Sequence, residues 1–136
     1  MTMATITEDY VSFETAKLLK KKGFDVWGDG SFNSGIEVFA EYSPSGTFNK
    51  CITSKPHQKA YPAPTLQMAM KWLREVHNLF IQVWIISEQG YWFNIDKLSD
   101  NYNHKDLYST GLEDIYYPTY EETVEAAIKY CLENLI

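Results

Sequence analysis

Two different spacings of hydrophobic residues run along this chain, and they divide it into helices and strands. Apolar side chains recur three or four positions apart in residues 13–22, 66–77 and 120–135, which is the spacing of one face of a helix. The intervening segments are rich in β-branched and aromatic residues and predict strands instead. The expected strands are 24–27, 36–42, 47–53, 79–87 and 91–95.

The residues that begin and end the helices are also recognisable. Ser12, Thr65 and Thr119 stand where the three helices begin, and a hydroxyl there can accept a hydrogen bond from a free backbone amide of the first turn. Gly23 and Asn78 stand where the first two helices end, because both residue types tolerate the left-handed conformation of a helix C-terminus. These signals support the helix boundaries independently of the hydrophobic spacing.

The second predicted helix carries only a narrow polar stripe. Gln67, Lys71, Arg74 and Asn78 follow one side of it, and apolar residues cover most of the remainder. We therefore expect this helix to be the most deeply buried of the three, with Leu73 in the core.

Turn-forming residues separate the predicted strands. Clusters of glycine, aspartate, serine or proline at 28–31, 43–46 and 88–90 predict hairpin connections. Residues 55–64 contain three prolines, too many for a helix or a central strand, and predict an extended surface connection. Residues 96–103 are interpreted as a turn. One further short strand is expected around 115–117.

The order of these elements, on a chain of 136 residues, predicts the α+β class. We expect an antiparallel or mixed sheet of about five strands with three helices packed mainly on one face. Residues 1–136 are expected to form a single domain, with residues 1–8 as a disordered or extended N-terminus.

Composition and charge narrow the classes of function. The chain has 18 acidic and 12 basic residues, a formal net charge of -6, which is the wrong sign for a surface that grips a phosphate backbone. The N-terminus shows no basic leader before an apolar run, and no window approaches the roughly 20 apolar residues of a membrane span. We therefore expect a cytoplasmic protein whose partner is neither nucleic acid nor a membrane.

The two cysteines show no spacing typical of a metal or redox site. Cys51 and Cys131 lie far apart, outside any CxxC or Cys/His pattern. Cys131 falls on the apolar face of the last helix and is expected to be a buried core residue. The sequence thus predicts neither a metal site nor a cofactor.

The helical segments also carry a family resemblance. Residues 61–78 are YPAPTLQMAMKWLREVHN, residues 120–135 are YEETVEAAIKYCLENL, and residues 12–24 are SFETAKLLKKKGF. These segments resemble a family of short uncharacterised proteins encoded by phages and mobile elements of gut bacteria. The resemblance implies a phage accessory protein that acts on a host factor in the bacterial cytoplasm, and it implies no particular activity.

Positive charge is concentrated just before the second helix. The basic residues there are Lys50, Lys55, His57 and Lys59. Free amides at a helix N-terminus attract anions, and Arg74, the only arginine, has the planar donor geometry that clamps phosphate. We therefore hypothesise a site for a small anionic, nucleotide-like ligand. The alternative is a solvated loop kept soluble by its lysines. The predicted ligand-binding residues are Lys55, His57, Lys59, Thr65 and Arg74.

Aromatic and acidic residues point to a protein-binding surface. Trp84, Tyr91, Trp92 and Phe93 lie in a predicted hairpin, where alternation sends some rings to each face of the sheet, so at least one ring is expected to be exposed. Residues 102–117 combine tyrosines with acidic residues, a composition typical of a surface directed at a basic partner. A mimic of nucleic acid and a solvated acidic loop are the alternative interpretations of this segment.

No catalytic motif stands out. We therefore expect a noncatalytic binding protein, a homo-oligomer that recognises a host protein or sequesters the small anionic ligand. An enzyme assembled from dispersed residues such as Arg74, His77 and Asp96 is one alternative, because catalytic groups are recognised by geometry rather than by order. A structural or assembly component of a phage particle is the other.

Overall fold

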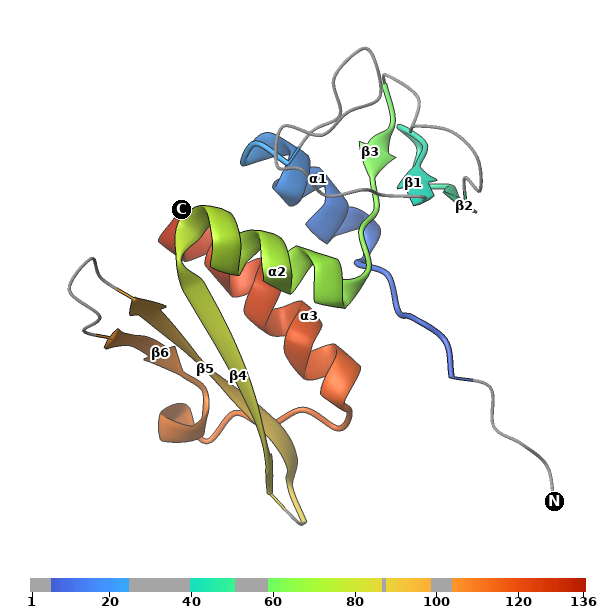
Figure 1. The fold of residues 1–136 in the computed structure, drawn as a ribbon. Helices are drawn as coiled ribbons and strands as arrows, with labels where there is room; N and C mark the ends of the chain where they lie inside the picture. Colours follow the sequence, from blue (N-terminus) through green and yellow to red (C-terminus); the bar gives the residue numbers. More distant parts are fainter. Residues whose placement is uncertain (1–5, 25–39, 51–58, 87, 99–103) are drawn as a thin grey trace, which may run out of the picture.

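The computed structural model describes residues 6–24, 40–50, 59–86, 88–98 and 104–136. Within them the chain forms three α-helices and six strands (Figure 1). The helices are α1 (Phe13–Lys21), α2 (Leu66–His77) and α3 (Tyr120–Tyr130), and a π-helical turn at Cys131–Leu135 follows α3. The strands are β1 (Ala40–Tyr42), β2 (Phe48–Lys50), β3 (Tyr61–Pro62), β4 (Leu79–Ile86), β5 (Gly90–Leu98) and β6 (His104–Ser109).

The helices begin where the sequence predicts. The side-chain oxygens of Ser12, Thr65 and Thr119 each accept a hydrogen bond from the backbone amide three residues further on. Asn78 follows α2 in the left-handed conformation with a φ of 56°, and Gly23 follows α1 with a φ of 104°. Local capping chemistry therefore accounts for the helix boundaries.

The six strands form two antiparallel sheets, with the orders β2-β1-β3 and β4-β5-β6. The α+β class and the antiparallel pairing are thus confirmed, whereas the expected single sheet of about five strands is corrected to two sheets of three. The division follows from β3, which is only two residues long and contains Pro62, a residue with no backbone N–H to donate to a neighbouring strand. β3 therefore remains an edge strand, and α2 carries the chain to the second sheet.

The first hairpin agrees with its prediction where the structure describes it, whereas the proline-rich connection is extended as predicted but is not on the surface, because residues 62–64 are buried. β1 and β2 flank a turn in which Gly46 has a φ of 98°. β3 lies in the extended connection and pairs with β1 at the edge of the small sheet. The predicted elements at 25–31, 36–39 and 51–53 lie outside the described residues.

The second hairpin is confirmed as β4 and β5, but the interpretation of the segment after it is wrong. β5 continues through Asp96 to Leu98, where a turn was expected, and pairs with β6. The expected strand at 115–117 is reduced to an isolated bridge between Tyr117 and Tyr91. The sequence does not predict β6, because β6 is a charged edge strand whose register against β5 shifts. Its apolar and polar residues therefore do not alternate regularly.

The helices and the second sheet enclose the core. α2 and α3 cover one face of the β4–β6 sheet, and α1 with the small sheet lies beyond them (Figure 1). In the described part of the chain no α-helix covers the other face of the β4–β6 sheet. The largest fully buried side chains include Trp72, Phe24, Phe93, Leu19, Leu73 and Ile95.

α2 is not the most buried helix, contrary to expectation. α2 and α3 bury four residues each, and the turn after α3 adds Cys131 and Leu132. Burial raises the pKa of the Cys131 thiol to about 12, so the thiol stays protonated and unreactive at neutral pH, as expected of a core residue. Among the described helices, none is long and apolar enough to cross a membrane.

Candidate functional site

The residues predicted to bind an anion are only partly placed. Thr65 caps α2 as expected, Lys59 is exposed just before β3, and Arg74 is exposed in the last turn of α2. Arg74 follows Thr65 by nine residues, about 13 Å along the helix axis. Lys55 and His57 lie outside the described residues. The structure therefore does not bring Thr65 and Arg74 together in one site.

The N-terminus of α2 is itself occupied by the segment that leads into α1. The Leu66 amide donates to the carbonyl oxygen of Asp9 at 2.8 Å, and the Met68 amide donates to Thr65 Oγ1 at 3.2 Å. The Val11 amide in turn donates to the Pro64 carbonyl oxygen at 3.1 Å. Two of the amides that would attract an anion are already bonded within the protein.

The residues of the alternative enzyme hypothesis, Arg74, His77 and Asp96, do not form one site either. His77 packs edge-on against Trp72, with ring centroids 4.7 Å apart, and burial followed by the charge of Lys97 lowers the pKa of its imidazole. Asp96 lies on the face of the sheet turned away from α2, since Ile95 beside it is buried toward the helices. No cluster of metal-ligating side chains occurs among the described residues.

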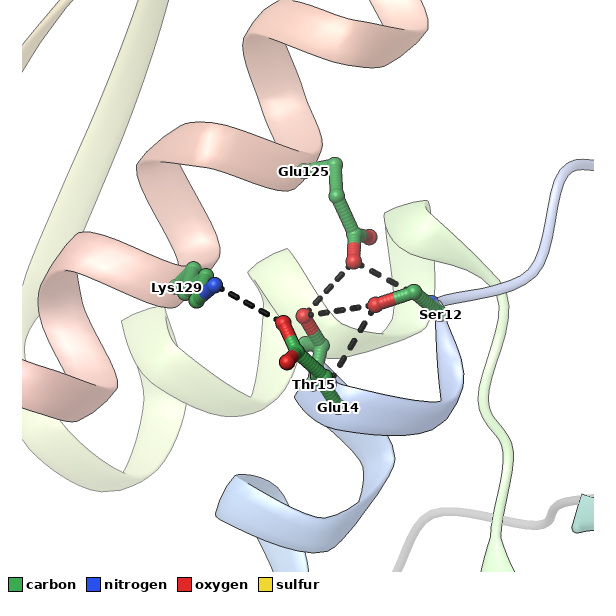
Figure 2. A network of polar contacts seen from close by, with 5 residues as sticks. All are labelled: Ser12, Glu14, Thr15, Glu125 and Lys129. Carbon is green, nitrogen blue, oxygen red and sulfur yellow. Dashed lines mark hydrogen bonds and ion pairs between the residues drawn. The ribbon is translucent and has the colours of Figure 1, made fainter. Parts of the chain in front are cut away.

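A polar network joins α1 to α3, and Figure 2 shows its five residues. Glu125 Oε1 accepts from Thr15 Oγ1 at 2.6 Å and from the Ser12 amide at 3.1 Å. Lys129 Nζ contacts Glu14 Oε2 at 2.9 Å, and this pair lowers the pKa of the Glu14 carboxyl and raises the pKa of the Lys129 ammonium. A wide hollow of about 600 Å³ opens beside the network. Because Glu125 is already bonded to α1, we interpret the network as structural.

Glu125→Ala is expected to lower the free energy of unfolding by about 1–2 kcal/mol, because the fully buried Thr15 hydroxyl and the Ser12 amide lose a charged acceptor. Urea unfolding measures the loss. Glu133→Ala is the matched control, since Glu133 is exposed in the turn that follows α3. Equal losses in the two variants would show that the contact between α1 and α3 does not depend on Glu125.

The uncovered face of the β4–β6 sheet carries the most distinctive group of side chains. We call it the open face. Its residues are Phe80, Gln82, Trp84, Trp92, Asn94, Asp96, Leu98 and Asp106. The expectation that alternation divides the hairpin aromatics is confirmed, because Trp84 is 48% exposed on the open face whereas Phe93 is 1% exposed against the helices.

Hydrogen bonds hold the open-face side chains in position. The Trp84 indole Nε1 donates to Asn94 Oδ1 at 2.6 Å, and Asn94 Nδ2 donates to Gln82 Oε1 at 2.8 Å and to Asp96 Oδ1 at 3.3 Å. Trp84 also stacks on Trp92 across the strands, with ring centroids 5.8 Å apart and 20° between the ring planes. The exposed indole is therefore held in one orientation by its hydrogen bond and its stacking contact.

Carboxylates and a shallow hollow lie beside the two tryptophans. Asp96 and Asp106 are directly opposite each other in the register of β5 and β6; Asp96 is buried at 8% exposure, whereas Asp106 is exposed. A hollow of about 250 Å³ is lined by Phe80, Gln82, Asp96 and Leu98. The open face thus combines aromatic rings, apolar walls and negative charge.

The 3₁₀ turn after β6 extends this surface. Gly111, at the start of the turn, packs on the Trp92 ring so closely that a side chain there would collide with it. Glu113 and Asp114 follow and are exposed. Of the acidic and tyrosine-rich stretch at 102–117, predicted to face a basic partner, Asp106 lies on the open face. Glu113 instead accepts from the Tyr108 hydroxyl at 2.7 Å, and Tyr108 stacks on Tyr130 of α3 on the opposite face.

Sequence reasoning found only part of this site. Alternation in the hairpin predicts that Trp84, Tyr91, Trp92 and Phe93 divide between two faces, without saying which ring is exposed, and Asp106 belongs to the predicted acidic stretch. Gln82 and Asn94 were missed, although both are polar residues at the same alternation phase as Trp84 and Trp92. A cross-strand register was needed to place them together.

Comparison of the chain with protein-family models, with curated proteins and with solved structures gives no match. The resemblance of its helical segments to the phage family therefore stays an expectation, and the geometry of the site is the basis for assigning a function.

Proposed function

We propose that this protein is a noncatalytic binding protein that docks a basic segment of a partner protein on the open face. The observation that carries the proposal is the exposed indole of Trp84, fixed by Asn94 and stacked on Trp92 beside carboxylates. Exposed tryptophans held in place this way are typical anchors of protein interfaces.

Arginine is the side chain that best matches this chemistry. Its planar guanidinium stacks on indole rings and binds carboxylates through two parallel hydrogen bonds. Asp106 supplies an exposed carboxylate opposite Asp96, and a carboxylate can accept several hydrogen bonds at once. The apolar walls formed by Phe80 and Leu98 would receive the aliphatic stem.

The geometry favours a protein partner over a small anion. The open face is acidic, as is the chain as a whole with its net charge of -6, and this repels anionic ligands. The anionic-ligand hypothesis stays a prediction, because Lys55 and His57 lie outside the described residues. Native mass spectrometry of the protein purified from its host would reveal a retained phosphorylated molecule if that hypothesis held.

The family resemblance extends the proposal to its setting. A small phage accessory protein would meet its partner in the bacterial cytoplasm, and the partner would then be a host protein with an exposed basic segment. The alternative functions, an enzyme or a component of the phage particle, find no specific support in the described residues.

The test uses the peptide Gly-Arg-Gly-Arg-Gly and the same peptide with citrulline, the neutral isostere of arginine, at both arginine positions. Binding is detected by the NMR shift of the Trp84 indole N–H. We expect the arginine peptide to bind about fivefold or more tightly than the citrulline peptide. Trp84→Ala and Asp106→Asn should each lower the affinity for the arginine peptide by about fivefold or more, measured by calorimetry.

Glu75→Gln is the matched control for charge, because Glu75 is exposed on α2, away from the open face. Its affinity for the arginine peptide should equal that of the unchanged protein. Equal binding of the two peptides, or full affinity in both Trp84→Ala and Asp106→Asn, would refute the proposal.

A further inference from the structure

β4 is a long edge strand without a charged residue. Its eight residues, Leu79–Ile86, pair with β5 on one side, and no other strand in the described part of the chain pairs with them. An uncharged apolar edge presents a row of backbone donors and acceptors to any strand that approaches. The opposite edge of the sheet, β6, carries exposed Lys105 and Asp106 and a register shift, which discourage such pairing.

The hydrogen bonds of β5 show which backbone groups of β4 point outward. Tyr91 exchanges two 2.8 Å backbone hydrogen bonds with Tyr117, on the side of β5 away from β4. The Phe93 carbonyl likewise accepts from the Thr110 amide at 3.0 Å. Tyr91 and Phe93 therefore do not bond to their partners in β4, whose own N–H and C=O groups must point away from β5. By this alternation the outward-pointing residues of β4 are Ile81, Val83 and Ile85.

The end of β4 nearest the hairpin turn is also the most accessible. The side chain of Ile85 is 70% exposed and that of Trp84 is 48% exposed. Ile85 thus presents both an apolar side chain and unpaired backbone groups in the same place, among the described residues. A free strand end of this kind is rarely left uncovered in a protein that stays monomeric.

The sequence of β4 fits a second copy of itself. A two-fold axis perpendicular to the sheet keeps each side chain on its own face, so residues that lie opposite one another must belong to the same face. The axis between two antiparallel copies of β4 must therefore pass beside a residue paired with its own equivalent, and not beside a peptide bond. If the pair of strands is centred on Val83, the outward-pointing backbone N–H and C=O groups of one copy meet those of the other copy. No charged side chains are brought together. The pairs that this register creates are Val83 with Val83, Ile81 with Ile85, Gln82 with Trp84 and Phe80 with Ile86.

We propose that β4 pairs antiparallel with β4 of a second copy of the chain, centred on Val83, and so joins two three-stranded sheets into one continuous sheet. The proposal goes beyond docking at the open face and does not depend on it. In such a dimer the two open faces lie on the same side of the joined sheet. Trp84 of one copy then neighbours Gln82 of the other.

The first test is the mass of the protein in solution. Light scattering after size exclusion should give twice the 15.8 kDa of one chain and a monomer on dilution. Ile85→Lys should raise the dissociation constant of the dimer about tenfold or more, because it places a charge in each half of the paired edge. Leu112→Lys is the matched control, since Leu112 is 89% exposed but lies outside β4, and it should leave the dimer unchanged.

The second test needs no variant. In the dimer the amides of Ile81, Val83 and Ile85 become bonded, so their hydrogen exchange measured by NMR should slow as the concentration rises. The amides of Gln82 and Trp84 already bond to β5 and should change little. This alternating pattern distinguishes edge pairing from any other contact between copies.

Three results would overturn the proposal. The first is a monomer at all concentrations up to about 1 mM. The second is a dimer equally stable in Ile85→Lys and Leu112→Lys. The third is a dimer in which exchange at Ile81, Val83 and Ile85 is not slowed, which would place the contact on another surface, including the open face.

Discussion

Leu73→Ala is expected to lower the free energy of unfolding by about 2–5 kcal/mol. Leu73 is fully buried in α2, within the cluster that joins this helix to the second sheet and α3. Removing the side chain loses its transfer free energy and leaves a cavity that the surrounding helices and sheet can fill only partly. Urea unfolding, with circular dichroism to confirm the fold, measures the change.

Val76→Ala provides the comparison for this prediction. Val76 lies one turn further along α2 and is 50% exposed, so its truncation leaves no enclosed cavity. Its cost should stay below about 1 kcal/mol. A loss of less than about 1 kcal/mol for Leu73→Ala, with the fold intact, would mean that α2 does not form the centre of the core.

Gly90→Ala is expected to destabilise the protein by about 2–6 kcal/mol. Gly90 begins β5 with a φ of 98°, which an L side chain adopts only under strain. A Cβ atom at this position would also collide with the carbonyl oxygen of Tyr117. That carbonyl accepts from the Tyr91 amide, so the collision displaces the bridge that joins β5 to the segment before α3.

Gly23→Ala separates the two causes. Gly23 has a φ of 104°, nearly the same strained conformation, but a Cβ atom there meets no heavy atom within 4 Å. Its cost should be about 1–3 kcal/mol, the strain alone. Thermal or urea unfolding of both variants gives the difference, which reports the collision with Tyr117. Equal losses would show that the carbonyl moves aside at no cost.

Much of the fold follows from local chemistry. Ser12, Thr65 and Thr119 predict the three helix starts because a cap acts on an amide only three residues away. The end of α2 at Asn78 and the hairpin turn before Gly90 depend on equally local interactions. The alternation of apolar residues in β4 and β5 predicts the hairpin for the same reason, since neighbouring positions of a strand alternate between its faces.

The candidate site was less accessible to this reasoning. The anion hypothesis used the charge near Thr65 but could not anticipate that the segment containing Asp9 bonds to the first amide of α2, because these residues are far apart in the sequence. β6 was missed because its charged residues pair only after the chain returns to β5. Without β6, Asp106 could not be placed opposite Asp96.

The sequence by itself determined the secondary structure of the helices, the hairpin and the division of its aromatic residues between two faces, since each depends on interactions between near neighbours. It did not determine which of those faces the helices would cover. Only the packing of α2 and α3 on the side of Phe93 and Ile95 left Trp84 and Trp92 exposed. The burial of apolar area depends on the whole chain, so the surfaces available for binding were decided by the tertiary structure.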